Sequence, residues 1–250
     1  NRLYKDMEII KEALTFDDLT LAPNFSQVLP SEVNTSTNLS KNLSLKIPLL
    51  TSAMDTVTES KMAIAMAELG GIGVIHRNLT IEQQISEIRK VKAKKCLVGA
   101  AVGASPREHS RAQKILKENL DLIVVDTAHA HTKKVGEIIK KIKRLKPKKT
   151  TLCAGNVATA EAAKYLIKLG VDIIKVGIGP GSICTTRLVA GIGVPQLSAI
   201  LSVKKGMGKS KCTLIADGGI KFSGDIAKAL AAGADAVMIG SLFAGTDQAP

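Results

Sequence analysis

One segment of the sequence places a cysteine among alternating glycines. Residues 177–187 read GIGPGSICTTR, with Cys184 directly before two threonines. A thiol needs only a modest lowering of its pKa to become a nucleophilic thiolate, and the glycines allow backbone carbonyls or N–H groups to face an ion. A dinucleotide fingerprint is excluded because it would need glycine at Ser182. From the residues alone, Cys184 fits either a catalytic nucleophile or a buried loop thiol.

Glycines and small polar residues also follow two of the apolar runs. Residues 217–219 read DGG, and residues 240–241 read GS. Backbone N–H groups in such turns, together with the hydroxyl of Ser241, suit a phosphate group, and parallel barrels often bind phosphate after their last two strands. These segments therefore predict a phosphate site, and the alternative is a pair of ordinary turns.

Short apolar runs alternate with helical patterns, and these elements must position the loops. The runs are continuous, as in parallel strands buried on both faces. Predicted strands span residues 47–52, 72–76, 97–102, 122–126, 151–154, 173–176, 213–216 and 236–239, and predicted helices span 59–69, 81–94, 106–118, 133–146, 160–169, 196–205 and 224–232. This order predicts a (β/α)₈ barrel, with a doubly wound sheet as the alternative.

A short repeat supports the barrel. Residues 169–172 (LGVD), 232–235 (AGAD) and 119–121 (NLD) each lead from a helical pattern into a strand. We expect residues 1–46 to form an N-terminal arm that packs on a barrel of residues 47–250. Only residues 241–250 follow the last strand, so we expect the barrel to be truncated or abbreviated at its C-terminal end.

Composition narrows the function classes. Hydrophobic residues make up 45% of the chain and charged residues 23%, which is ordinary for a globular protein. Aromatic residues make up only 2%, which argues against a base-stacking surface for single-stranded nucleic acid. The net charge is +13, but many lysines lie on helical patterns such as residues 133–149. This favours a solvated helix face over a nucleic-acid surface.

Cysteine and histidine spacing argues against metal and disulfide chemistry. Cys96, Cys153 and Cys212 lie far apart without a CxxC pair, and His129 and His131 lack the HExxH spacing of a catalytic zinc site. No apolar run reaches the roughly 18 residues of a membrane span, and no signal peptide is recognisable. We therefore expect a cytoplasmic protein with free thiols.

The cysteine loop and its continuation resemble the signature of the IMP dehydrogenase / GMP reductase family. The loop runs on into VAGIGVPQ at residues 189–196. Other segments match in order: LTFDD (14–18), SAMDTVTE (52–59), GGIGVIH (70–76), VGAAVG (98–103), AGNV (154–157), ADGGI (216–220) and FSGD (222–225). The resemblance runs from about residue 8 to residue 250. Residues 52–59 and 189–193 resemble the dehydrogenase rather than the reductase.

The resemblance implies NAD-dependent oxidation of inosine monophosphate (IMP) to xanthosine monophosphate (XMP). Cys184 would attack carbon 2 of the hypoxanthine ring, hydride would leave to NAD⁺, and the thioimidate would be hydrolysed beside Thr186. The implied nucleotide-binding residues are Ser52, Met54, Ser182, Asp217, Gly218, Gly219, Gly240 and Ser241, with Asp217 on the ribose hydroxyls. The implied NAD-binding residues are Asp126, Thr127, Asn156, Lys175 and Gly177. Carbonyls of Gly179, Gly181 and Cys184 would face a potassium ion.

The sequence departs from the family pattern in three places. The CBS regulatory pair expected near residues 92–97 is missing, Ala130 stands where the family has glycine, and Pro250 precedes the family's mobile flap with its hydrolytic base. The alternatives are a GMP reductase that uses NADPH, or a nucleotide-binding barrel without turnover. The family also implies a homotetramer.

Overall fold

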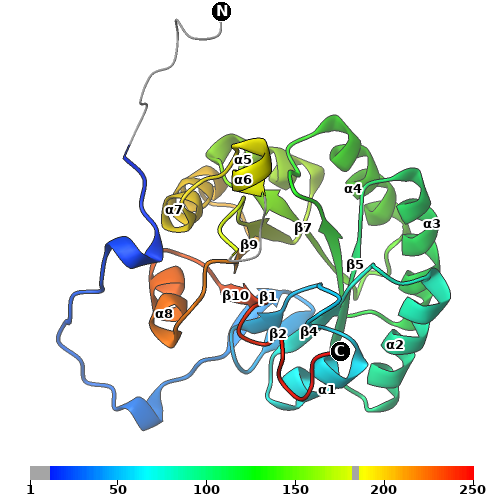
Figure 1. Ribbon diagram of the computed structural model, residues 1–250, viewed down its shortest axis with the longest axis horizontal. Coiled ribbons are helices and arrows are strands. Elements are labelled where there is room, and N and C mark those ends of the chain that lie inside the picture. The colour runs from blue at the N-terminus through cyan, green and yellow to red at the C-terminus, as the bar shows by residue number, and fades with distance from the viewer. Residues whose placement is uncertain (1–11, 182–185) are drawn as a thin grey trace, which may run out of the picture.

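A computed structural model describes residues 12–181 and 186–250. Its centre is a closed barrel of parallel strands in the order β10-β3-β4-β5-β6-β7-β8-β9 (Figure 1). The strands are β3 Leu49–Thr51, β4 Ile72–Ile75, β5 Val98–Val102, β6 Leu122–Asp126, β7 Thr151–Val157, β8 Ile173–Val176, β9 Thr213–Asp217 and β10 Ala236–Ile239. The predicted (β/α)₈ barrel is confirmed. A doubly wound sheet is excluded because β10 pairs with β3 and closes the sheet.

Helices cover the outside of the barrel (Figure 1). They are α1 Ser60–Glu68, α2 Ile81–Ala93, α3 Pro106–Ile115, α4 Lys133–Leu145, α5 Ala160–Leu169, α6 Thr186–Ala190, α7 Gln196–Met207 and α8 Ser223–Ala231. Threonine side chains cap α2, α4 and α5 by accepting from backbone N–H groups in the first turn. All of the predicted helices are present. The extra helix α6 has five residues, too few to show a helical period in the sequence.

The sequence repeat has a structural cause. Asp121, Asp172 and Asp235 each stand just before a strand, and each carboxylate accepts from a backbone N–H at the start of the neighbouring strand, at 2.7–2.9 Å. These contacts tie β5 to β6, β7 to β8, and β9 to β10 at their N-terminal ends. The aspartate therefore fixes the register in which each strand enters the barrel.

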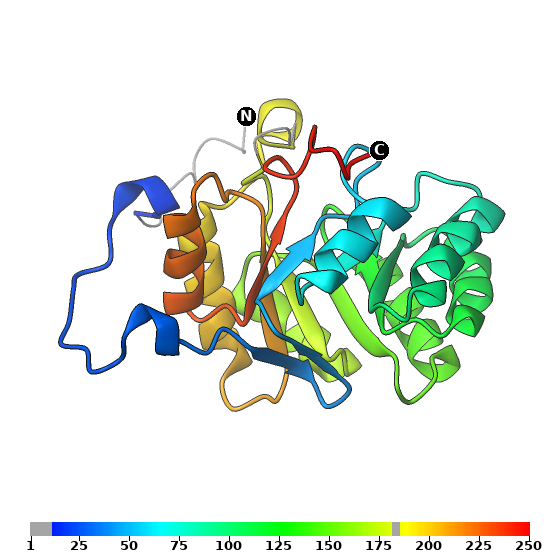
Figure 2. The same cartoon turned by 90° about the horizontal axis from the view of Figure 1, so that it is seen from below.

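Alternate strand residues fill the barrel interior, and a hairpin that was not predicted closes one end. Leu50, Val74 and Ile215 belong to a buried cluster inside the strands. The hairpin of β1 Thr37–Ser40 and β2 Leu43–Leu45 adds Leu39, Leu43 and Leu45 to it. Figure 2 shows the hairpin below the strands, whereas α6 and the C-terminus lie at the opposite end. The hairpin leucines therefore cover the interior at one end of the barrel.

The segment before the hairpin swings away from the barrel (Figure 1). Its first part is attached, because the Leu14 N–H donates to Ser198 Oγ at 2.8 Å, Phe16 is buried, and Lys228 Nζ donates to the Phe16 carbonyl. Residues 20–36 are all exposed, and Phe25 is 84% exposed. This looped-out segment, residues 20–36, carries exposed apolar side chains that the rest of the described chain does not cover.

Candidate active site

Polar side chains gather where the strands end, at the open end of the barrel. Because side chains alternate along a strand, the residues that continue the inward-facing rows are Ser52, Asp126, Lys175 and Asp217. Functional groups of (β/α)₈ barrels lie at this end of the strands. The strand order brings Asp126 and Asp217 within reach of Lys175 from two other strands.

Lys175 is the centre of this polar group. Its ammonium lies 2.9 Å from Asp126 Oδ1 and 2.5 Å from Asp217 Oδ2, and the residue is 3% exposed. Burial alone would lower the pKa of Lys175, but the two carboxylates outweigh burial and raise the pKa above the ordinary lysine value. Lys175 is therefore a fixed cation, and the three groups together carry a net charge of about −1.

Two amides connect this ion cluster to the glycine loop. Asn156 Nδ2 donates to Asp217 Oδ2 at 2.9 Å and to the Gly177 carbonyl at 2.7 Å. Gln196 Nε2 donates to the carbonyls of Val176 and Asp217. The amide oxygens Asn156 Oδ1 and Gln196 Oε1 are buried without a hydrogen-bond partner within residues 12–181 and 186–250. Buried acceptors without a partner are rare in folded proteins.

A first pocket of about 220 Å³ opens beside these groups. It is lined by Ser52, Met54, Asn156, Gly177, Gly179, Pro180, Gly181, Asp217, Gly218, Gly219, Ile220, Lys221, Met238, Ile239, Gly240 and Ser241. A Cβ on Gly177 would lie 2.1 Å from the Asp217 carbonyl oxygen, and a Cβ on Gly240 would lie 2.9 Å from Met54 Sδ. Glycine at these positions keeps the wall compact and leaves room for a ligand.

A second pocket of about 270 Å³ adjoins the first. It is lined by Ser52, Ala53, Met54, Arg77, Asp126, Thr127, Ala128, Asn156, Lys175, Asp217 and Met238. Ser52, Met54, Asn156, Asp217 and Met238 line both pockets. Two ligands could therefore meet across the ion cluster.

The structure brings most of the sequence-predicted site residues into these two walls. Among the described candidates, Thr186 is the exception, since it begins α6 and lines neither pocket. Ser182 and Cys184 lie outside the described residues, so the predicted nucleophile has no position here. Sequence reasoning did not assign Gln196 or Arg77 to the site. Gln196 is the last residue of the VAGIGVPQ segment, and Arg77 directly follows GGIGVIH.

Comparison with known proteins gives the family. The sequence model of the IMP dehydrogenase / GMP reductase domain matches residues 13–250. The chain belongs to this family.

Individual relatives agree with that assignment. The inosine-5'-monophosphate dehydrogenase of Borreliella burgdorferi is 47% identical over 97% of this chain and 72% of the relative. Those of Cryptosporidium parvum and Aquifex aeolicus are 46% and 37% identical, each over 96% of this chain and over 70% and 75% of the relative. The chain thus covers more than two thirds of each relative.

The family comparison also bears on the predicted loss of the regulatory pair. The alignment with the Aquifex aeolicus relative runs over 369 residues, more than the 250 of this chain, so the relative has inserted segments that this chain lacks. In this member of the family, four residues, 94–97, connect the end of α2 to the start of β5. A CBS pair is absent there.

Two of the described cysteines, Cys153 and Cys212, lack the features of a nucleophile. Cys153 is fully buried in the barrel interior, and burial raises the pKa of its thiol to about 12. Burial also raises the pKa of Cys212.

Within residues 12–181 and 186–250, no helix is long and apolar enough to span a membrane, and no cluster of three or more His, Cys, Asp or Glu side chains could hold a metal.

Proposed function

We propose that this chain oxidises IMP to XMP with NAD⁺ as the hydride acceptor. The proposal rests on one observation above all: two adjoining pockets share a wall at the Lys175 ion cluster, and the first is lined by Gly177, Gly179 and Gly181, which shortly precede Cys184 in the sequence. A hydride donor in one pocket and an acceptor in the other would face each other across that wall. Family membership supports the same reaction.

The first pocket would hold the nucleotide. Backbone N–H groups of Gly218, Gly219 and Gly240, with the Ser241 hydroxyl, are suitable donors to a phosphate. Asp217 uses Oδ2 for Lys175 and Asn156, and its Oδ1 makes no hydrogen bond to the part of the chain that the structure describes. This oxygen would accept from the ribose hydroxyls, with Ser52, Met54 and Ser182 against the rest of the nucleotide.

The second pocket would hold the nicotinamide end of NAD⁺. Asp126, Thr127, Asn156 and Lys175 from its wall are the proposed binding residues, together with Gly177 from the adjoining wall of the first pocket. The ion cluster has a net charge of about −1, which favours a cationic ring next to it. When bound, NAD⁺ supplies the acceptor for the hydride. The protein's contribution is to orient that acceptor against the nucleotide.

Cys184 would supply the covalent step. Its thiolate would add to carbon 2 of IMP, hydride would leave that carbon to NAD⁺, and a thioimidate would remain on the sulfur. Water would then add at the same carbon, release XMP and return the thiol, with Thr186 beside the reacting water. The balance is IMP, NAD⁺ and water giving XMP, NADH and a proton.

The proposed potassium site consists of the carbonyls of Gly179, Gly181 and Cys184. Gly179 and Gly181 belong to the wall of the first pocket, and Gly179 has a left-handed φ of +77°. Carbonyl oxygens are the hard ligands that such cations take. An ion there would hold the two glycines and the Cys184 backbone together.

A pair of assays tests the reaction. Protein mixed with IMP and NAD⁺ should form NADH in the first turnover, whereas protein mixed with GMP and NADPH should leave NADPH unoxidised. Oxidation of NADPH with release of ammonia would instead identify a GMP reductase. Nucleotide binding without NADH would identify a binding barrel and would refute the proposal.

We also propose that the chain assembles with copies of itself into a homotetramer. The looped-out segment exposes Phe25, Val28, Leu29 and Val33, at 56–84% of their surface. Exposed apolar groups this close together are typical of a protein interface. Replacement of Phe25 and Leu29 by serine should lower the solution mass measured by light scattering, and an unchanged tetramer would contradict this role for the segment.

A further inference from the structure

The loop from His76 to Thr80 is held rigidly at the edge of the second pocket. The His76 carbonyl accepts from Gln84 Nε2 at 3.0 Å, and the Asn78 N–H donates to His76 Nδ1 at 3.1 Å. Asn78 Nδ2 donates to Asp55 Oδ2 at 2.7 Å, and the Leu79 carbonyl accepts from Arg111. His76, Asn78 and Leu79 are thus each anchored by hydrogen bonds, and the side chain of Arg77 extends from this anchored backbone.

A buried polar network supports the surface beneath that side chain. The Gly103 N–H donates to Glu108 Oε2 at 2.6 Å, Glu108 pairs with Arg111, and Arg111 donates to Gln84. All three side chains of this network are buried. A Cβ on Gly103 would lie 3.2 Å from Cζ of Arg77. The guanidinium therefore lies against the bare backbone of Gly103.

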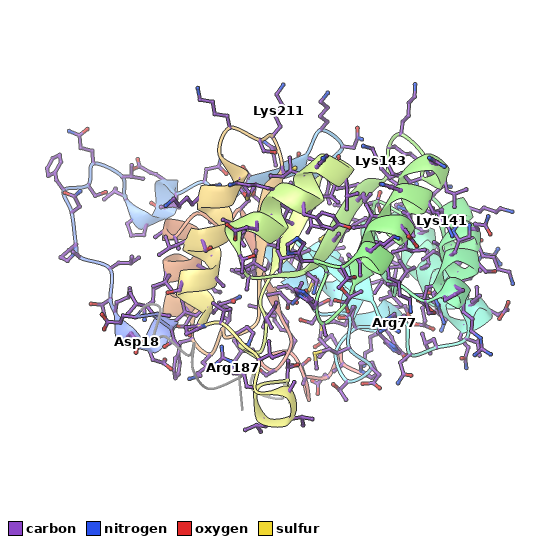
Figure 3. The ribbon with its side chains drawn as sticks, turned by 90° about the horizontal axis from the view of Figure 1, so that it is seen from above. Asp18, Arg77, Lys141, Lys143, Arg187 and Lys211 are labelled. Carbon is purple, nitrogen blue, oxygen red and sulfur yellow. The ribbon has the colours of Figure 1, made fainter. Side chains whose placement is uncertain are left out.

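Arg77 differs from the other cations of the two pockets. Lys175 is paired with Asp126 and Asp217, and Lys221 is paired with Asp17 at 2.8 Å. Arg77 has neither an ion pair nor a hydrogen bond from its side chain to residues 12–181 or 186–250, and it is exposed. In Figure 3 it lies toward the end of the barrel that carries Arg187, away from Lys211. It is an available cation on a fixed support.

We propose that Arg77 binds the diphosphate of the dinucleotide whose nicotinamide end occupies the second pocket. This inference rests on the proposed function, which assigns NAD⁺ to that pocket. A planar guanidinium donates two parallel N–H groups to phosphate oxygens, a geometry that lysine cannot supply. Asp126 and the ion cluster face the cationic ring, and Arg77 at the pocket edge faces the anionic bridge. The negative ion cluster would thus lie next to the cationic ring of NAD⁺, and the positive Arg77 next to its anionic diphosphate.

Kinetics of an Arg77→Ala variant test the assignment. We expect the KM for NAD⁺ to rise about tenfold, the KM for IMP to stay within about twofold, and first-turnover NADH formation at saturating NAD⁺ to change little. Arg77→Lys should restore only part of the loss. Arg107→Ala is the matched control, because Arg107 is an exposed arginine at the start of α3 that lines neither pocket. A rise in the KM for IMP instead would overturn the assignment.

Binding of fragments separates this inference from the proposed function. ADP-ribose contains the diphosphate, whereas adenosine does not. By calorimetry, Arg77→Ala should weaken ADP-ribose about tenfold and leave adenosine unchanged. Equal effects on both fragments, or no ADP-ribose binding by the wild-type chain, would refute the role of Arg77. A wild-type chain that binds ADP-ribose through Arg77 but forms no NADH would refute the proposed reaction alone.

Discussion

The polar residues at the N-terminal ends of the barrel strands differ in role from those at the C-terminal ends. At their N-terminal ends, Asp121, Asp172 and Asp235 bind backbone N–H groups, and leucines of the β1–β2 hairpin close the interior. At their C-terminal ends, Asp126 and Asp217 bind the Lys175 ammonium instead, and glycines leave two pockets open. The N-terminal aspartates therefore hold the backbone as well as pairing with Lys92, Lys146 and Lys204, whereas Asp126 and Asp217 pair with one buried lysine.

Positive charge is also distributed unevenly between the ends. The connections at the N-terminal end contain many exposed lysines: Lys41, Lys94, Lys95, Lys148, Lys149, Lys209 and Lys211. At the C-terminal end, the central cation is buried and doubly paired. The candidate site is thus defined by a few charges around one buried cation, and the net charge of +13 says little about them.

The largest effect is expected at the buried cation. Lys175→Met would leave two partly exposed carboxylates without their cation and should lower the free energy of unfolding by about 3 kcal/mol, the lower end for breaking a buried ion pair. Because the pKa of Lys175 is raised on folding, its contribution is complete below about pH 10 and is lost only as the pH rises further. Urea unfolding at pH 6 and pH 9 should therefore show the same deficit.

Lys221→Met is the control for this prediction, since Lys221 pairs with Asp17 at the protein surface. We expect its effect to be small by comparison. Equal losses for the two variants would mean that the Lys175 cluster is hydrated and that the contrast between buried and exposed charge is wrong.

A smaller effect is expected at the proposed phosphate position. Ser241→Asp places a carboxylate in the wall of the first pocket, where repulsion of a phosphate amounts to a few kcal/mol at an effective dielectric near 20. The affinity for IMP should fall at least about tenfold, and the affinity for inosine should change little. Calorimetry with both ligands measures this. Equal losses would move the phosphate away from Ser241.

At the N-terminal end, removal of a carboxylate should affect stability but not chemistry. Asp121→Ala removes the acceptor that the Val98 N–H and Lys92 Nζ share and should cost about 1.5–3 kcal/mol. First-turnover NADH formation should be unchanged, because the site lies at the other end. Glu68→Ala, which removes an exposed carboxylate at the last residue of α1, is the control without a stability change. Loss of NADH formation in the folded Asp121 variant would show that the two ends are coupled.

The smallest change is expected in thiol labelling. Cys153 is fully buried with a pKa of about 12, so it should remain unmodified by an alkylating reagent at pH 8 and react fully in urea. Mass spectrometry of the Cys153 peptide measures both states. Rapid labelling of the native chain would mean that the barrel interior opens.

The barrel could be predicted because its strands appear in the sequence as continuous apolar runs, and because the turns before three of them repeat an aspartate. Sequence reasoning missed the β1–β2 hairpin because Leu39, Leu43 and Leu45 are too few to show a period, and their burial depends on the barrel above them. It found most of the candidate site from motifs at strand ends. It missed Gln196 and Arg77 because their positions follow from contacts across the fold, with Val176 and Gly103, rather than from residue type.

We expect Cys184 to perform the covalent chemistry, whereas the Cys153 thiol inside the barrel takes no part in it. The most direct measurement is NADH formed in the first turnover by the Cys184→Ala and Cys153→Ala variants, mixed with IMP and NAD⁺. We predict a loss of at least about a thousandfold for Cys184→Ala and a change of no more than a few-fold for folded Cys153→Ala. NADH formation by Cys184→Ala at a rate near that of the wild-type chain would contradict the account.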